Sequence, residues 1–248
     1  MKGTILSEIT YEEAEKIINE DTIIALPIGG AIKEHGPHLP CGSDYYTVQE
    51  IANRIVEKFD LVLLPTLPFG YYPAFVDWPG SVSINSRLFM DIIADIIRPF
   101  AKKGVKKFLI IDVGVSTQTP LKLLSSDLHN ELGIYLAITD FGEIWANLEE
   151  EVCEQEKGGH GDEVETSLIL STRPELVKMD KAVEEYSQSS INTIVDGRRI
   201  INIRGKMRTK SGINGNPIFA TKEKGDLFFE EAIDILVDFL KEYKEMEV

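Results

Sequence analysis

The chain has 248 residues, of which 43% are hydrophobic and 27% charged, and its formal net charge is −15. This acidic balance argues against binding to a nucleic-acid backbone, which depends on clustered Lys and Arg. No run of about 18 apolar residues occurs and the first residues lack the apolar segment of a signal peptide, so we expect a cytoplasmic protein that does not span a membrane.

Apolar segments rich in β-branched residues alternate along the chain with segments of helical periodicity, as is typical of βαβ units. We therefore expect an α/β fold with a largely parallel sheet, formed by one domain over residues 1–248. Strands are predicted at 22–29, 61–67, 107–115 and 134–141, and helices at 11–19, 45–59, 87–103, 119–132, 162–172 and 227–245.

Two of the predicted helices begin with recognisable capping residues. Thr10 and Glu13 have the spacing of a capping box before the first helix. Either Ser43 or Asp44 is expected to cap the second helix.

Three segments fall outside these elements. Residues 66–86 and 204–226 are rich in Gly and Pro, which indicates functional or interface loops. The one basic run, residues 196–210, is expected to form a basic surface or an interface rather than a nucleic-acid groove.

Polar clusters follow the predicted strands at residues 33–44, 112–118 and 158–167. In an open parallel sheet, ligands gather outside the carboxyl ends of the strands. The densest cluster, KEHGPHLPCGSD, contains two histidines, a glutamate and an aspartate and therefore suggests a metal site. His38 within it is expected to be structural and to stabilise the turn after Pro37.

Four segments in order along the chain resemble motifs of one known family, the creatininase (creatinine amidohydrolase) family. LPIGGAIKEHGPHLPCGSD resembles the family's L-P-x-G-S-x-E-Q-H-G-P-H-L-P-L-x-T-D, and GGHGDEVETSLILSTRPELV resembles its H-A-G-E-x-E-T-S segment. PTLPFGYYPAFVDWPGSVSI and GINGNPIFATKEKG resemble its P-x-x-x-Y-G…F-P-G-T and G-x-x-G-x-P…A-T-x-E-x-G segments. Four ordered motifs make a more specific signal than any single motif.

The resemblance implies a creatininase-like fold, a three-layer α/β/α sandwich with a mostly parallel central sheet. It also implies a homo-oligomer, usually a hexamer. Family members hydrolyse non-peptide C–N bonds in small cyclic or formyl amides with two divalent metal ions. Paired ions polarise the amide carbonyl and supply hydroxide near neutral pH.

The resemblance places His35 and Asp44 at metal-ligand positions and gives Glu163 as the third ligand, with Glu165 as second choice. Two family ligands are replaced, one by Lys33 and the other, in the segment after the third strand, by Val115. Because residues i and i+2 of a strand point the same way, we expect Lys33 to face the site and Glu34 to face away from it. We therefore expect one divalent ion, zinc, with manganese or iron as alternatives.

Lys33 has two open interpretations. Its ammonium would oppose a nearby cation and could stand in for the missing ion, which would give it a catalytic role, or it could simply neutralise Asp44 in a decayed site. His160 matches the family histidine that gives a proton to the leaving nitrogen. Trp145 and Glu165 are candidate substrate-binding residues, although Trp145 could equally belong to the core, as expected for Trp78.

These residues support three hypotheses of function. The first is a metal-dependent amidohydrolase with a depleted, single-ion site that acts on a small cyclic or formyl amide. The second is a non-catalytic member of the fold that binds a small molecule or serves as an assembly subunit. The third is metal-free hydrolysis with Lys33 as base or electrostatic catalyst, which requires a depressed pKa of Lys33.

Overall fold

The central sheet is parallel and five-stranded, with the order β1-β3-β2-β4-β5. The computed structural model describes residues 1–187, 194–195, 198–199 and 209–247. The strands of the sheet are β1 (Thr4–Ile5), β2 (Ile23–Ile28), β3 (Val62–Leu63), β4 (Lys107–Asp112) and β5 (Tyr135–Ile138). A separate antiparallel pair is formed by β6 (Ile194–Val195) and β7 (Arg198–Arg199).

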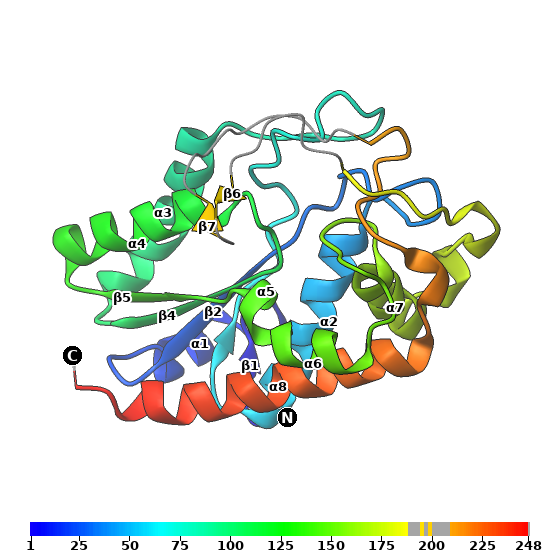
Figure 1. Ribbon diagram of the computed structural model, residues 1–248. Coiled ribbons are helices and arrows are strands. Elements are labelled where there is room, and N and C mark those ends of the chain that lie inside the picture. The colour runs from blue at the N-terminus through cyan, green and yellow to red at the C-terminus, as the bar shows by residue number, and fades with distance from the viewer. Residues whose placement is uncertain (188–193, 196–197, 200–208, 248) are drawn as a thin grey trace.

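Helices cover both faces of the sheet, so the fold is an α/β sandwich (Figure 1). Helices α3 and α4 pack on one face, and α2, α7 and α8 pack on the other. The helices are α1 (Tyr11–Ile17), α2 (Ser43–Lys58), α3 (Ser86–Ala101), α4 (Gln118–Leu132), α5 (Phe141–Ile144), α6 (Ala146–Val152), α7 (Glu163–Thr172) and α8 (Lys222–Glu245). Short 3₁₀ turns lie at Leu6–Glu8, Pro174–Leu176, Met179–Lys181 and Pro217–Phe219.

The central strands β2 and β4 are buried along their whole length. Their side chains alternate between two separate cores: Ile23 and Leu109 pack under α8, whereas Ile24 and Phe108 pack under α3 and α4. A strand covered on both faces favours apolar residues on both sides, which is why β2 and residues 108–111 of β4 are continuous apolar runs in the sequence.

The predicted strands and helices are all present, and most are shorter than predicted. The expected capping box of Thr10 and Glu13 is confirmed. The expected cap of the second helix is wrong, because α2 begins at Ser43 itself after Gly42, and the Ser43 hydroxyl donates instead to the Pro40 carbonyl. The basic run 196–210 lies mostly outside the described residues.

The sheet order places the carboxyl ends of β2 and β4 side by side. The connection after β2 runs to β3 on one side, whereas the connection after β4 runs to β5 on the other, so the two connections leave in opposite directions. A crevice forms outside the carboxyl ends of strands at such a reversal. The residues after Ile28 and at Asp112 lie at this crevice, because these two positions are paired in register. None of the described helices is long and apolar enough to cross a membrane.

Candidate functional site

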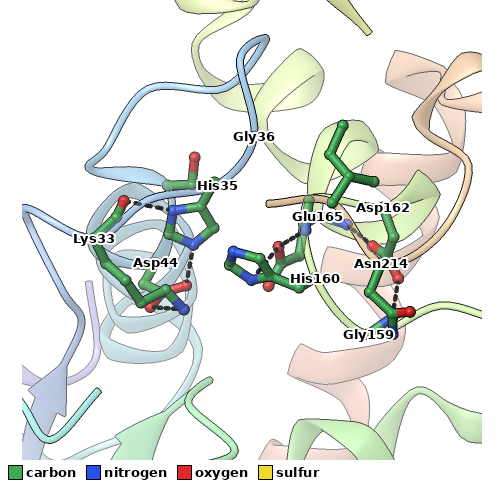
Figure 2. Close-up of polar contacts among 12 residues, drawn as sticks. Lys33, His35, Gly36, Asp44, Gly159, His160, Asp162, Glu165 and Asn214 are labelled. Atoms are coloured by element: carbon green, nitrogen blue, oxygen red, sulfur yellow. Dashed lines mark hydrogen bonds and ion pairs between the residues drawn. The ribbon is translucent and has the colours of Figure 1, made fainter. Parts of the chain in front are cut away.

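Lys33 and Asp44 form a buried ion pair at this crevice. The Lys33 Nζ lies 2.7 Å from Asp44 Oδ2, and the two residues are 5% and 3% exposed. Asp44 belongs to the first turn of α2, and Lys33 lies in the irregular segment before it (Figure 2). The expectation that the Lys33 amine points inward is therefore confirmed.

The strand geometry behind that expectation is wrong. Residues 31–35 do not form a strand, and the Lys33 amide donates to the Cys41 carbonyl in a loop. Glu34 does not face solvent: it is 7% exposed, and its Oε2 lies 3.2 Å from His160 Nε2. A loop lets consecutive side chains turn inward in different directions, so Lys33 meets Asp44 while Glu34 meets His160.

Both members of the ion pair stay charged at neutral pH. Burial alone would lower the pKa of Lys33, but the negative charges of Asp44 and Glu165 raise it. Burial would raise the pKa of Asp44, but Lys33 and His35 hold it well below its ordinary value. A raised pKa opposes the use of Lys33 as a neutral base, because the amine keeps its proton. Lys33 is therefore a fixed positive charge in the site.

Two aromatic rings from the loop after β3 cover this charge. The Lys33 Nζ lies 5.2 Å from the ring centroid of Tyr72 and 5.1 Å from that of Phe75. Ring faces carry partial negative charge and attract a cation at this range. Phe75 also packs against His160, with 4.4 Å between the ring centroids.

His35 presents one ring nitrogen as a metal ligand would. Its Nδ1 lies 2.9 Å from the Lys33 carbonyl oxygen, and because a carbonyl only accepts, Nδ1 carries the proton. Its Nε2 lies 2.7 Å from Asp44 Oδ1. In a neutral imidazole this places a lone pair against a carboxylate oxygen, and a cation coordinated by both atoms would relieve the repulsion. A backbone carbonyl that fixes the far nitrogen is a common support for a metal-binding histidine.

His160 and Glu165 complete a group of possible ligands with His35. One ligand atom from each residue lies within 4.8 Å of the other two. The imidazole rings of His35 and His160 are 4.9 Å apart, and His160 Nδ1 lies 3.6 Å from Glu165 Oε2. Two imidazoles and a carboxylate suit a catalytic zinc, manganese or iron ion. The donor set therefore fits one divalent cation.

The structure brings Glu165, and not Glu163, to this group. Glu163 is fully buried, and its carboxylate accepts from the backbone amides of Glu154 and Gln155 and pairs with Lys224 Nζ at 2.5 Å. Residues two apart on a helix point about 200° apart, so only one of the two glutamates on α7 can face His160. For Glu165, burial raises the pKa against the opposing attraction of His160 and Lys33.

Trp145 lies in the core and not at the site. It is 8% exposed, its indole N–H donates to the Phe228 carbonyl at 2.8 Å, and its ring packs 4.6 Å from that of Phe141. Trp78 is half-buried. Val115 is 72% exposed on the loop after β4.

His38 is engaged by another part of the chain. Its Nε2 lies 2.8 Å from the Thr166 hydroxyl on α7, and its backbone carbonyl accepts from the Lys178 amide. Burial lowers the pKa of His38 to about 4, so the ring is neutral at physiological pH. These contacts agree with the structural role expected from the sequence.

Two residues of the site were not singled out from the sequence, although Asp112 begins the polar cluster 112–118 and Tyr72 lies in the family-like segment 65–84. Asp112, at the end of β4, accepts from the Thr117 hydroxyl and, at 3.2 Å, from the Gly114 amide, and burial raises its pKa to about 7. Tyr72 is 2% exposed, and its hydroxyl has no hydrogen-bond partner among the described residues. The position of Asp112 at the carboxyl end of a buried strand was the only available signal for it.

Comparison with known proteins gives a family match over most of the chain. A family model described as creatinine amidohydrolase (creatininase) matches residues 7–240. The creatinine amidohydrolase of Pseudomonas putida is 23% identical over 260 residues, which covers 97% of each chain. The 3-dehydro-scyllo-inosose hydrolase of Thermotoga maritima is 24% identical over 202 residues, or 73% of this chain and 60% of that protein.

A third relative and several solved structures agree with this match. The mycofactocin precursor peptide peptidase of Mycolicibacterium smegmatis is 22% identical over 228 residues, or 90% of this chain and 85% of that protein. A creatininase crystal structure is 21% identical and covers both chains completely, with a TM-score of 0.80. Similar creatininase structures are described as a manganese form, 22% identical with a TM-score of 0.79, and a zinc–zinc form, 21% identical with a TM-score of 0.76. Both cover 99% of this chain and all of the other.

Proposed function

Since the chain belongs to the creatininase (creatinine amidohydrolase) family, we propose that it is a metal-dependent hydrolase that cleaves the C–N bond of a small cyclic or formyl amide. The observation that carries the proposal is the group of His35, His160 and Glu165, whose ligand atoms lie within 4.8 Å of one another. The two imidazoles are buried and the carboxylate is half-buried, and a set of this composition matches the ligands of catalytic metals.

The proposed ion is held by His35, His160 and Glu165, with Asp44 Oδ1 beside His35. Zinc is our first choice, and manganese or iron suits the same donors. When bound, a divalent ion polarises the amide carbonyl and makes hydroxide available near neutral pH. We propose a single ion, because the Lys33 ammonium on Asp44 Oδ2 repels a second cation at that oxygen.

The other residues orient the proposed ligands and keep water out. The Lys33 carbonyl fixes His35 through Nδ1, and Glu34 holds His160 through Nε2. The family resemblance gives His160 the role of proton donor, whereas its distance from His35 and Glu165 supports a ligand role. A His160→Gln variant distinguishes them: it loses the metal if His160 is a ligand, but keeps the metal and loses turnover if His160 is the proton donor.

A small substrate suits the enclosed centre, in which Lys33, His35 and His160 are each at most 5% exposed. The relative named creatinine amidohydrolase spans the same length as this chain, which supports an amide substrate. The other two relatives are named for different substrates, so creatinine itself is not proposed. We also propose, from family membership, a cytoplasmic homo-oligomer, with a hexamer as the expected form.

One observation favours a second candidate, a non-catalytic protein that binds a small molecule or serves as an assembly subunit. The charged groups at the centre already have protein partners: Asp44 pairs with Lys33 and His35, and Glu34 pairs with His160. Such a network is complete without an ion if His35 and His160 are protonated.

The test is turnover against a panel of small amides, with formamide, N-methylformamide, 2-pyrrolidone and hydantoin as probes. We expect hydrolysis of at least one probe, its loss after dialysis against a chelator, and its recovery when zinc or manganese is added. Bound metal without turnover of any probe would favour the second candidate. Turnover that survives complete metal removal would contradict the metal-dependent mechanism.

A further inference from the structure

The Tyr72 hydroxyl is a buried donor without an acceptor. The residue is 2% exposed, and no acceptor takes the proton of its hydroxyl among the described residues. The backbone amide of Gly30 faces the oxygen, but it is a donor and cannot accept the phenolic proton. Burial of a hydroxyl without a partner destabilises a protein, and phenylalanine would avoid that cost. The Tyr72 hydroxyl therefore needs a hydrogen-bond acceptor that the described residues do not supply.

Three glycines make room for the Tyr72 ring. A Cβ added to Gly30 would lie 2.9 Å from Tyr72 Cε2, one added to Gly70 would lie 2.6 Å from the hydroxyl oxygen, and one added to Gly114 would lie 3.3 Å from Cε1. These glycines come from the loops after β2, β3 and β4. A side chain at Gly30 or Gly70 would force the ring to shift, and one at Gly114 would press against it.

The Lys33 ammonium, next to the Tyr72 ring, is a second donor with N–H groups left for a further hydrogen bond. It carries three N–H groups, and among the described residues Asp44 is its one ion-pair partner. The Nζ lies 5.2 Å from the Tyr72 ring centroid. The Tyr72 hydroxyl and the Lys33 ammonium are therefore buried donors in one cluster, and both have protons to give to an acceptor from outside the chain.

We propose that the Tyr72 hydroxyl, together with the Lys33 ammonium, donates hydrogen bonds to the carbonyl oxygen of a neutral amide substrate. This inference rests on the proposed function and adds to it the group that binds the substrate oxygen. The ligand is a neutral carbonyl and not a carboxylate, because Asp44, Glu34 and Glu165 already concentrate negative charge around the cluster.

The chemistry of amide hydrolysis gives these donors their role. The oxygen of a water molecule bonds to the carbonyl carbon, the C–N bond breaks, and the leaving nitrogen takes a proton. Negative charge develops on the carbonyl oxygen during addition, and fixed donors aimed at that oxygen stabilise the transition state more than the ground state. Burial raises the pKa of Tyr72 well above its ordinary value, so the phenol keeps the proton that it donates.

Tyr72→Phe removes the hydroxyl and keeps the ring. Tyr71→Phe is the matched control, because it removes a neighbouring hydroxyl from a half-buried ring that packs in the α3 and α4 core. Wild type and both variants are compared in thermal unfolding, metal content, hydrolysis of the amide panel, and binding of 2-pyrrolidone followed by nuclear magnetic resonance. Binding is measured separately, so that it reports on Tyr72 even when no turnover is found.

We expect Y72F to lower kcat/KM by about 100-fold and to weaken 2-pyrrolidone binding several-fold, with unchanged metal content and an equal or higher Tm. Y71F should leave all of these unchanged. A Y72F variant with a lower Tm and unaltered kcat/KM and 2-pyrrolidone affinity would overturn the inference, since the hydroxyl would then be structural. Binding by wild type that Y72F weakens, without any turnover, would support the inference and refute the proposed function. Wild type that neither binds nor hydrolyses the probes would overturn both.

Discussion

Lys33 and Asp44 form a buried ion pair in which the lysine occupies one carboxylate oxygen and leaves the other to His35. One oxygen of Asp44 thus contacts the Lys33 ammonium, and the other contacts Nε2 of His35, which is a candidate metal ligand. Because the Lys33 ammonium occupies one carboxylate oxygen of Asp44, we propose one metal ion per chain.

Removal of the lysine should destabilise the fold. In Lys33→Met, the buried Asp44 carboxylate loses its cationic partner, and we expect the free energy of unfolding to fall by about 3 kcal/mol or more. The double variant K33M/D44N should recover much of this loss, because no unpaired charge remains. Urea denaturation measures all three proteins.

The matched control for this prediction is Lys58→Met, which breaks an exposed pair with Asp234 across 3.7 Å. It should change stability by less than about 0.5 kcal/mol. Equal effects of K33M and K58M would contradict the account of the buried pair.

The two glutamates of α7 should separate metal binding from stability. Glu165→Gln is expected to lose the bound metal and to change little in the stability of the metal-free protein. Glu163→Gln is expected to keep the metal and to lose about 1–3 kcal/mol, because its carboxylate holds two backbone amides and Lys224. Metal analysis and urea denaturation of both variants provide the check, and metal loss in E163Q alone would reverse the assignment.

Asp112 should make stability fall as pH rises through the weakly acidic range. Burial raises its pKa from the ordinary 3.8 to about 7 in the folded state. Between these values the unfolded chain releases a proton that the folded chain keeps, so unfolding becomes easier as pH rises, by up to about 1.4 kcal/mol per pH unit. The contribution levels off above about pH 7.

Asp112→Asn removes this titration and can keep the contact with the Gly114 amide through its carbonyl oxygen. We expect the stability of D112N relative to wild type to increase between pH 5 and pH 7. A difference that stays constant over this range would show that Asp112 is ionised throughout.

Trp145→Phe should lower the stability of the protein and leave substrate binding unchanged. The change removes a hydrogen bond to the Phe228 carbonyl and leaves space beneath α8, so we expect a loss of about 1–3 kcal/mol. KM for a hydrolysed amide should stay within about twofold of wild type. A large rise in KM with unchanged Tm would contradict this prediction and would support the substrate-binding role that the sequence suggested for Trp145.

Most of the fold could be predicted because the buried strands leave a continuous apolar signal. Strand β2 and residues 108–111 of β4 are apolar at every position, and the helices between the strands keep their own periodicity. Strand β1 has two residues and α5 has four, which is too short for any periodic pattern to appear. The predicted ends of β4 and β5, residues 115 and 141, lie beyond the observed ends at Asp112 and Ile138, because strand pairing stops where the chain turns into the crevice.

The site was predictable where a dense motif or a family-like segment marks its residues, as for His35, Asp44 and His160. His35 and Asp44 lie in one dense motif, whereas the choice between Glu163 and Glu165 depends on the rotation of α7 against His160, which the sequence does not specify. Tyr72 lies in the family-like segment 65–84, but its buried hydroxyl is recognised only in the structure, where glycines from three loops surround the ring. The inward orientation of Glu34 depends on residues 31–35 forming a loop and not a strand.

The decisive measurement is the metal content of the wild-type protein, purified without chelators, by inductively coupled plasma mass spectrometry. We expect one divalent ion per chain, lost in variants of His35, His160 or Glu165. Two ions per chain would contradict the role of Lys33 as the second cation of the centre, and a chain that binds none after incubation with zinc, manganese or iron would contradict the metal site itself.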